Sequence, residues 1–220
     1  MLESALESLR RGEFVLLFDS AGRENEIDMV VAAEFITPEH ISRMRRHAGG
    51  LVCTALEHSF AESLHLRYMH EMLADSEHRD MVLGLAPYGD RPSFSISVNH
   101  HSTYTGITDR DRALTIQKIA SIYGMSERRK EFVSSFRTPG HVPLLVAADG
   151  LLAERRGHTE MSVYLARLAG LVPVTVVCEM LDAQTYAALT VKEAQKFAKQ
   201  HAIPLVDGEE LLGYAKVHLS

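Results

Sequence analysis

The stretch Arg23-Glu24-Asn25-Glu26-Ile27-Asp28 places three carboxylates within five positions, between two apolar segments. In an extended backbone, alternate side chains share one side, so Glu24, Glu26 and Asp28 can point the same way. Clustered carboxylates repel one another unless a positive group lies among them, which here is either Arg23 or a divalent cation. Mg²⁺ takes one or two carboxylates and completes its shell with water and substrate oxygens. The stretch is therefore a candidate metal or substrate loop, and its alternative is a solvated charged turn.

A second polar stretch, Arg155-Arg156-Gly157-His158-Thr159-Glu160, opens a predicted helix. Arginine can contact a phosphate through two N–H groups, and glycine lets the backbone approach closely. Thr159 would lie at the helix N-terminus, where free backbone N–H groups attract anions. His158 could be a metal ligand or a base. The pattern indicates an anion cradle, and a plain surface loop with a helix cap is the alternative.

Two single residues carry a further signal. His141 follows a predicted Pro-Gly turn and precedes an apolar strand, and residues at strand ends often have catalytic roles. A structural histidine is the alternative. Glu179 ends an apolar run, where burying a carboxylate costs several kcal/mol unless it is paired or functional. Glu179 is thus the strongest single-residue indication of catalysis, with a salt bridge at the end of a sheet as its alternative.

The elements that must position these residues alternate loosely, without a strict strand–helix–strand rhythm. Strands are expected at residues 14–18, 29–35, 51–56, 93–99, 142–148 and 172–180. Helices are expected at residues 2–11, 38–47, 59–66, 109–123, 126–133 and 160–169, and a helix, a strand and a helix follow. Residues 67–92 are polar and are expected to form a surface excursion. No repeat or linker divides residues 1–220, so we expect an α+β fold with one domain, in which helices pack against a mixed sheet.

Composition narrows the class of protein. In 220 residues, 23 Lys and Arg against 29 Asp and Glu give a net charge of −6, which argues against a protein that coats nucleic acid. Two cysteines, Cys53 and Cys178, exclude a disulfide scaffold and a thiolate zinc site. The first residues lack the apolar core of a signal peptide, and the longest apolar run, 171–178, is too short to span a membrane. We expect a cytoplasmic protein that binds neither nucleic acid nor membrane.

Five segments, in this order, resemble the 3,4-dihydroxy-2-butanone 4-phosphate synthase family: FDSAGRENEIDMVVAAEFITPEHI, RRHAGGLVCTAL, TGITDRDRALTI, FRTPGHVPLLVA and RRGHTEMSVYLARLAGLVPVTVVCEM. The resemblance covers nearly the whole chain and is nearer to the stand-alone archaeal form than to longer fused chains. It implies a single synthase domain over residues 1–220. It also implies an α–β–α layered fold and a homodimer whose active sites lie close to the dimer interface.

The family converts D-ribulose 5-phosphate into L-3,4-dihydroxy-2-butanone 4-phosphate and formate in riboflavin biosynthesis, using Mg²⁺ or Mn²⁺. Carried over by position, the resemblance implies that Glu24 and His158 are metal ligands and that His141 and Glu179 are catalytic. It also implies substrate contacts from a set of polar residues along the chain: Arg23, Glu24, Asp28, Thr105, Arg155, Thr159 and Glu179.

Three departures from the family pattern leave these positions intact. Arg156 stands where many relatives have glycine, the segment after Glu179 keeps only Asp182 of an acidic turn, and Ser20-Ala21-Gly22 replaces acids before the Arg-Glu-Asn-Glu motif. Two alternative functions stay open. One is another Mg²⁺-dependent phosphosugar isomerase or lyase, and the other is a catalytically silent relative that binds sugar phosphates.

Overall fold

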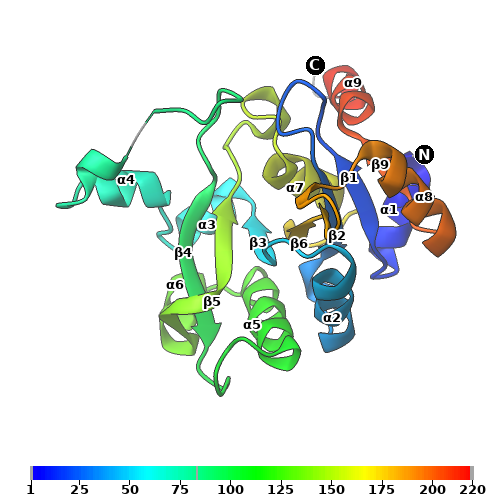
Figure 1. Ribbon diagram of the computed structural model, residues 1–220. Helices are drawn as coiled ribbons and strands as arrows, with labels where there is room; N and C mark the ends of the chain where they lie inside the picture. The colour runs from blue at the N-terminus through cyan, green and yellow to red at the C-terminus, as the bar shows by residue number, and fades with distance from the viewer. Residues whose placement is uncertain (1, 83, 219–220) are drawn as a thin grey trace.

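The computed structural model describes residues 2–82 and 84–218, and Figure 1 shows helices packed around a central sheet. The strands of this sheet lie in the order β4-β5-β3-β6-β2-β1-β9. Their bounds are β1 (Val15–Phe18), β2 (Ile27–Ala32), β3 (Cys53–Leu56), β4 (Phe94–His100), β5 (Phe136–Val146), β6 (Val174–Glu179) and β9 (Leu205–Asp207). A separate hairpin pairs β7 (Leu181–Asp182) with β8 (Ala187–Ala188). The sheet is mixed, because β3–β5 and β1–β9 are parallel pairs and the other neighbours are antiparallel.

The helices cover both faces of the sheet. Their bounds are α1 (Leu2–Arg10), α2 (Pro38–His47), α3 (His58–Ser63), α4 (Met69–Ala74), α5 (Asp109–Ile122), α6 (Arg128–Ser135), α7 (His158–Leu168), α8 (Val191–His201) and α9 (Gly208–His218). One apolar cluster joins a face of the sheet to α2, α3, α5 and α8, and a second joins the other face to α1, α7 and α9. Figure 1 shows α7 and α5 on opposite sides of the strands. The expected α+β fold with α–β–α layers around a mixed sheet is confirmed.

Strand alternation separates the two cysteines. Cys53 packs in the cluster with α1 and α7, whereas Cys178, one position beyond the partner of Cys53 on β6, packs in the opposite cluster. Both thiols are free and buried. Period-two alternation therefore decides which side chains of β2, β3 and β6 face α7 and which face α2 and α5.

Most of the expected elements are present, with shifts at their ends. The helix α2 covers the expected residues 38–47, with Pro38 as its first residue and the Thr37 hydroxyl as its cap. The strand expected at 29–35 instead begins at Ile27 and gives way to a 3₁₀ turn at Ala33–Phe35. The cap of α5 is Thr108, whose hydroxyl accepts the Asp111 N–H, and the helix begins at Asp109, the first residue of the expected range.

In place of the predicted Pro-Gly turn before residue 142, residues 138–141 form an irregular part of β5, because Val142 pairs with Val98 and Arg137 pairs with the next residue of β4. Hydrogen bonds between side chains and backbone groups connect β4 and β5 there. The Thr138 hydroxyl donates to the Ser97 carbonyl, and the Gly140 N–H donates to the Ser97 hydroxyl. A register shift between Val98 and the next residue of β4 accommodates the irregular stretch.

The excursion at residues 67–92 is more than a polar loop. It contains α4, which projects beyond the edge strand β4 in Figure 1, and a 3₁₀ turn at Arg79–Met81. Its last residues return to the sheet, where Tyr88 lines a cavity. Across the described residues, no helix is long and apolar enough to cross a membrane.

Candidate active site

A cavity of about 200 Å³ lies over the face of the sheet that α7 covers. Cys53, Leu145 and Val177, which belong to the same apolar cluster, line it on the sheet side. Polar side chains reach it from the β1–β2 loop, from the start of α7 and from the end of β6. The cavity thus collects residues from segments more than 130 positions apart.

The β1–β2 loop is held by one buried carboxylate, Asp19. Its Oδ2 accepts the Glu24 N–H at 2.9 Å and its Oδ1 accepts the Glu26 N–H at 3.1 Å. The Arg23 guanidinium lies 3.3 Å from Oδ2. These contacts turn the loop so that Glu24, Glu26 and the first polar residue of β2, Asp28, all line the cavity, as their spacing predicts.

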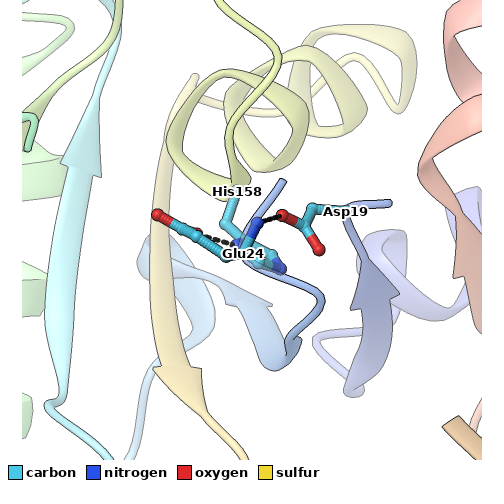
Figure 2. Close-up of side chains that lie close together, drawn as sticks. All are labelled: Asp19, Glu24 and His158. Carbon is cyan, nitrogen blue, oxygen red and sulfur yellow. Dashed lines mark hydrogen bonds and ion pairs between the residues drawn. The ribbon is translucent and has the colours of Figure 1, made fainter. Parts of the chain in front are cut away.

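Asp19, Glu24, Glu26 and Asp28 form an acidic cluster around His158. Figure 2 shows Glu24 and His158 at its centre, with Asp19 beside them. His158 Nδ1 lies 3.1 Å from Glu24 Oε2, and its Nε2 lies 3.2 Å from the Glu26 carbonyl oxygen and 3.8 Å from Asp28 Oδ1. Burial by itself would raise the pKa of Glu24, but the hydrogen bond from His158 and the charge of Arg23 lower it to about 2. Glu24 is therefore a carboxylate throughout the ordinary pH range.

The protonation of His158 and Asp28 follows from their burial and their neighbours. Burial would lower the pKa of His158, but the carboxylates of Asp28 and Glu24 raise it to about 9. Burial raises the pKa of Asp28 to about 7, with His158 opposing and Glu179 and Glu24 adding to the rise. A protonated His158 therefore balances the acidic cluster at neutral pH.

The cluster has the donor set of a divalent cation site. Ligand atoms of Asp19, Glu24 and His158 all lie within 4.8 Å of one another. Asp28 Oδ1 is buried and has no hydrogen-bond partner among the described side chains and backbone. The oxygens of Asp19 already accept two backbone N–H groups, so we assign Asp19 to holding the loop and leave Glu24, His158 and the free oxygen of Asp28 for a cation.

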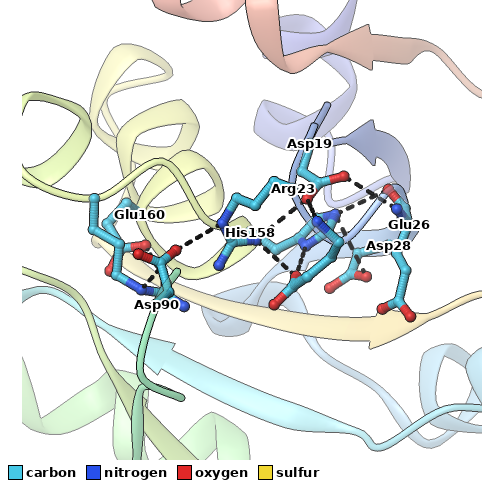
Figure 3. A network of polar contacts seen from close by, with 9 residues as sticks. Asp19, Arg23, Glu26, Asp28, Asp90, His158 and Glu160 are labelled. Atoms are coloured by element: carbon cyan, nitrogen blue, oxygen red, sulfur yellow. Dashed lines mark hydrogen bonds and ion pairs between the residues drawn. The ribbon is translucent and has the colours of Figure 1, made fainter. Parts of the chain in front are cut away.

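Ion pairs of Arg23 and Arg155 extend the acidic cluster into a larger polar network. Figure 3 shows Asp90 and Glu160 at one end and Asp28 and Glu26 at the other, with Arg23 and His158 between them. Within the described ranges, Nη2 of Arg23 and Nε of Arg155 are buried without a hydrogen-bond partner. The two guanidinium groups converge on Gly157, where a β-carbon would collide with both. Unpaired guanidinium N–H groups beside a helix N-terminus suit a phosphate.

A buried carboxylate orients Arg155. Glu160 has no exposed surface, its Oε2 lies 2.6 Å from Nη1 of Arg155, and its Oε1 accepts the Ala148 N–H at 3.0 Å. The opposite charge of Arg155 offsets the cost of burying this carboxylate. Asp90 approaches the same cradle, with Oδ2 2.9 Å from Nε of Arg23 and 3.7 Å from Nε of Arg155.

Glu179 lies at the end of β6, directly opposite Asp28 of β2. Its Oε2 accepts the Leu51 N–H at 2.8 Å. A β-carbon at Gly50 would collide with Glu179. Glu179 is only half-buried, so the expectation of a costly buried carboxylate at this position is wrong in degree. The carboxylate opposite it, that of Asp28, is fully buried, at 2 % exposure.

The structure brings most of the predicted site residues into this cavity: Arg23, Glu24, Asp28, Arg155, His158, Thr159 and Glu179. It places His141 and Thr105 elsewhere. Both are exposed, and both contact the Asn99 amide, His141 through its backbone and ring and Thr105 through its carbonyl oxygen. The two residues form a second group at the β4–β5 side of the sheet.

Sequence reasoning missed four residues of the network: Asp19, Tyr88, Asp90 and Glu160. Asp19 could have been found from the sequence, because it follows an apolar run directly, as Glu179 does, and a carboxylate at such a position indicates a functional or paired residue. Glu160 lies in a motif that the sequence singles out, but only the folded structure shows its ion pair with Arg155. Tyr88 and Asp90 lie in the polar excursion, and no local pattern connects them with Arg23.

The 3,4-dihydroxy-2-butanone 4-phosphate synthase family model matches residues 3–214 of the chain. The 3,4-dihydroxy-2-butanone 4-phosphate synthase of Methanothermobacter thermautotrophicus is 48% identical over 96% of this chain and 94% of its own length.

Two solved structures are similar over almost their whole length. A 3,4-dihydroxy-2-butanone 4-phosphate synthase in a cation-free form superposes with a TM-score of 0.82 at 30% identity and covers 100% of this chain and 98% of its own. A structure of such a synthase in complex with two magnesium ions has a TM-score of 0.81 at 32% identity and covers 98% and 96%.

Proposed function

This chain belongs to the 3,4-dihydroxy-2-butanone 4-phosphate synthase family, and from that premise we propose which residues perform each part of the reaction. The protein is a lyase of riboflavin biosynthesis that converts D-ribulose 5-phosphate into L-3,4-dihydroxy-2-butanone 4-phosphate and formate with a divalent metal. The observation that carries the assignment of residues is a single cavity lined by carboxylates, an imidazole and two arginines, each of which keeps one buried guanidinium nitrogen without a hydrogen-bond partner in the described part of the chain.

We propose that Glu24 and His158 hold the metal ion, with Asp28 beside it. A divalent ion bound there supplies a positive charge that stabilises the enediolate form of a neighbouring ketone and hydroxyl. Asp19 keeps Glu24 in place through the loop backbone, and Arg23 lies within 2.8 Å of Glu24 Oε2. Mg²⁺ and Mn²⁺ both suit carboxylate and imidazole ligands, and we propose that either supports turnover.

We propose that the proton transfers use Glu179 and His141. The reaction removes a proton from carbon 3 of the substrate and loses water at carbon 1, so it needs a base and an acid, each worth about 10²–10⁴-fold in rate. Glu179 lines the cavity beside Asp28. His141 and Thr105 lie outside the cavity of their own chain, which supports a site completed by a second copy.

The proposed homodimer places His141 and Thr105 of one protomer at the cavity of its partner. The test mixes two inactive variants, H141Q and E179Q, under conditions that exchange subunits. If each site combines residues of two chains, random exchange restores about a quarter of the wild-type activity, because half of the dimers carry one intact site of two. No recovery in a mixture shown to contain heterodimers would place both residues in one chain.

We propose that Arg155, Arg23 and Thr159 bind the substrate phosphate. Replacing Arg155 by Ala is expected to raise KM for ribulose 5-phosphate by about 30-fold or more, with a smaller effect on kcat, because a charged contact worth about 2–3 kcal/mol is lost. The change also leaves Glu160 buried without its partner, so the double variant R155A/E160Q separates binding from stability. R156A, on an exposed neighbour, is the matched control. An unchanged KM in both Arg155 variants would contradict this phosphate site.

We expect protons and metal ions to compete for His158. A group whose pKa is raised from 6.5 to about 9 by folding contributes stability that is complete below pH 6.5 and is lost as pH rises through about 9. A metal ion must displace that proton, so Mg²⁺ affinity is expected to rise by about tenfold per pH unit between pH 7 and 9. Calorimetric titration at several pH values measures this slope, and H158Q is expected to flatten it. Equal affinities at pH 7 and 9 would contradict His158 as a ligand.

We also propose that residues 1–220 act as one synthase domain, which is supported by one sheet joining β1 near the start with β9 near the end.

We propose the cytoplasm as the compartment, where the two free thiols on opposite faces of the sheet would stay reduced.

The function is tested by incubating the purified protein with Mg²⁺ and ribulose 5-phosphate. Release of formate together with a four-carbon phosphate is expected. A five-carbon isomer would indicate another phosphosugar enzyme, and unchanged substrate would indicate a binding protein.

A further inference from the structure

Asn99 is a buried polar residue that the proposed reaction has not used. It lies in β4 beside His141 of β5 and is 3 % exposed. Its Oδ1 accepts the backbone N–H of His141 at 2.8 Å. Its Nδ2 lies 3.1 Å from Nδ1 of the same histidine and 3.4 Å from the Thr105 carbonyl oxygen. The whole amide is therefore engaged, and most of its contacts are with His141.

These contacts determine the tautomer of the His141 ring. A backbone N–H can only donate, so the amide atom that faces it must be the oxygen. The other amide atom is then the NH₂ group, which also only donates, so Nδ1 of His141 must accept. A neutral imidazole that accepts at Nδ1 carries its proton on Nε2.

Two glycines allow Asn99 to lie this close to its partners. Gly106 has a φ of +92°, and a β-carbon at that position would collide with the Asn99 side chain. A β-carbon at Gly140 would collide with the backbone of Val98 and Asn99. A larger residue at either position would push Asn99 away from His141.

We propose that Asn99 is the positioning residue of His141: it holds the imidazole in one orientation and sets its neutral tautomer, leaving Nε2 as the nitrogen available to the substrate. This inference rests on the proposed role of His141 in proton transfer. The contact itself can be tested without turnover.

Titratable groups on the elements around the ring are engaged with other partners. Arg137 of β5 donates to backbone carbonyl groups of the loop before α5, and Asp111 of α5 accepts a backbone N–H of that loop. Nδ1 of His100, on β4, accepts a backbone N–H two residues ahead. Replacing Asn99 by Asp therefore introduces a new charge directly beside Nδ1 of His141.

The first test is a nitrogen NMR spectrum of protein labelled in histidine, with H141Q identifying the resonances of His141. The wild type is expected to carry the proton on Nε2 at a pH where the ring is neutral. N99D is expected to move that proton to Nδ1, since a carboxylate only accepts. T138V, which removes a hydrogen bond between the same two strands, is the matched control and is expected to keep the wild-type tautomer. A wild-type ring protonated on Nδ1 would overturn the proposal.

The second test is kinetic. N99L removes the amide and is expected to lower kcat by about tenfold or more, while KM for ribulose 5-phosphate changes by less than about threefold. N99D still accepts the His141 backbone N–H and holds the ring in place, but it changes Nε2 from a donor to an acceptor, so kcat is expected to stay low, with the pH–rate profile moved upward by about one pH unit. A packing role alone would not move that profile. An N99D profile equal to that of the wild type would overturn the proposal.

The two tests separate this proposal from the proposed function. An H141Q variant with full activity would remove His141 from the reaction, and with it the kinetic part of the inference. The nitrogen spectra would still decide whether Asn99 sets the tautomer.

Discussion

Replacing Glu179 by Gln is expected to lower formate release by about 10²-fold or more, because the amide cannot carry a proton to or from the substrate. The change keeps the size of the side chain and an oxygen that can accept the Leu51 N–H. Circular dichroism, gel filtration and thermal unfolding are therefore expected to match the wild type. Formate measured under saturating substrate and Mg²⁺ gives the loss of activity.

The matched control for this variant is E34Q. Glu34 is also half-buried and also accepts one backbone N–H, from Val172 at 2.9 Å, but it lies outside the cavity. E34Q is expected to keep full activity. If E179Q unfolds while E34Q does not, Glu179 is a structural residue. If E179Q keeps more than about a tenth of the activity, its role in proton transfer passes to another group.

Removing divalent metal with a chelator is expected to abolish formate release while the fold is retained. The acidic cluster stays balanced without metal, because a protonated His158 and Arg23 lie among its carboxylates. Adding Mg²⁺ is expected to restore turnover. Activity and thermal unfolding measured on the same stripped sample test both parts of this expectation.

The variant E24Q identifies the site of that metal requirement. It removes one proposed ligand and is expected to lose activity that excess Mg²⁺ does not restore at concentrations sufficient for the wild type. Full activity in a metal-stripped wild type would remove metal from the reaction. A wild-type response to Mg²⁺ in E24Q would move the ion to other residues.

The sequence by itself determined the local arrangement of the site. Spacing at every second residue predicts that Glu24, Glu26 and Asp28 share one side, and all three line the cavity. The Arg-rich stretch before residue 160 predicts a helix opening, and α7 begins at His158. These features depend on backbone geometry within a few residues, which neighbouring side chains specify.

Only the tertiary structure decided the protonation of these groups and the partners that hold them. The sequence favours Glu179 as the buried carboxylate, but the strand pairing buries Asp28 instead and leaves Glu179 half-exposed. Asp90 reaches Arg23 across 67 positions of chain. Burial and long-range ion pairs depend on how distant segments pack, and no local pattern encodes that packing.

The separation of His141 from the cavity has the same origin. Its motif predicts a residue at the mouth of a strand, and the sheet order then places that strand two positions away from β6 and beside the edge strand β4. The contact with Asn99 arises from a register shift between β4 and β5. Register and strand order are properties of the whole sheet, so only the tertiary structure shows which residues surround this histidine.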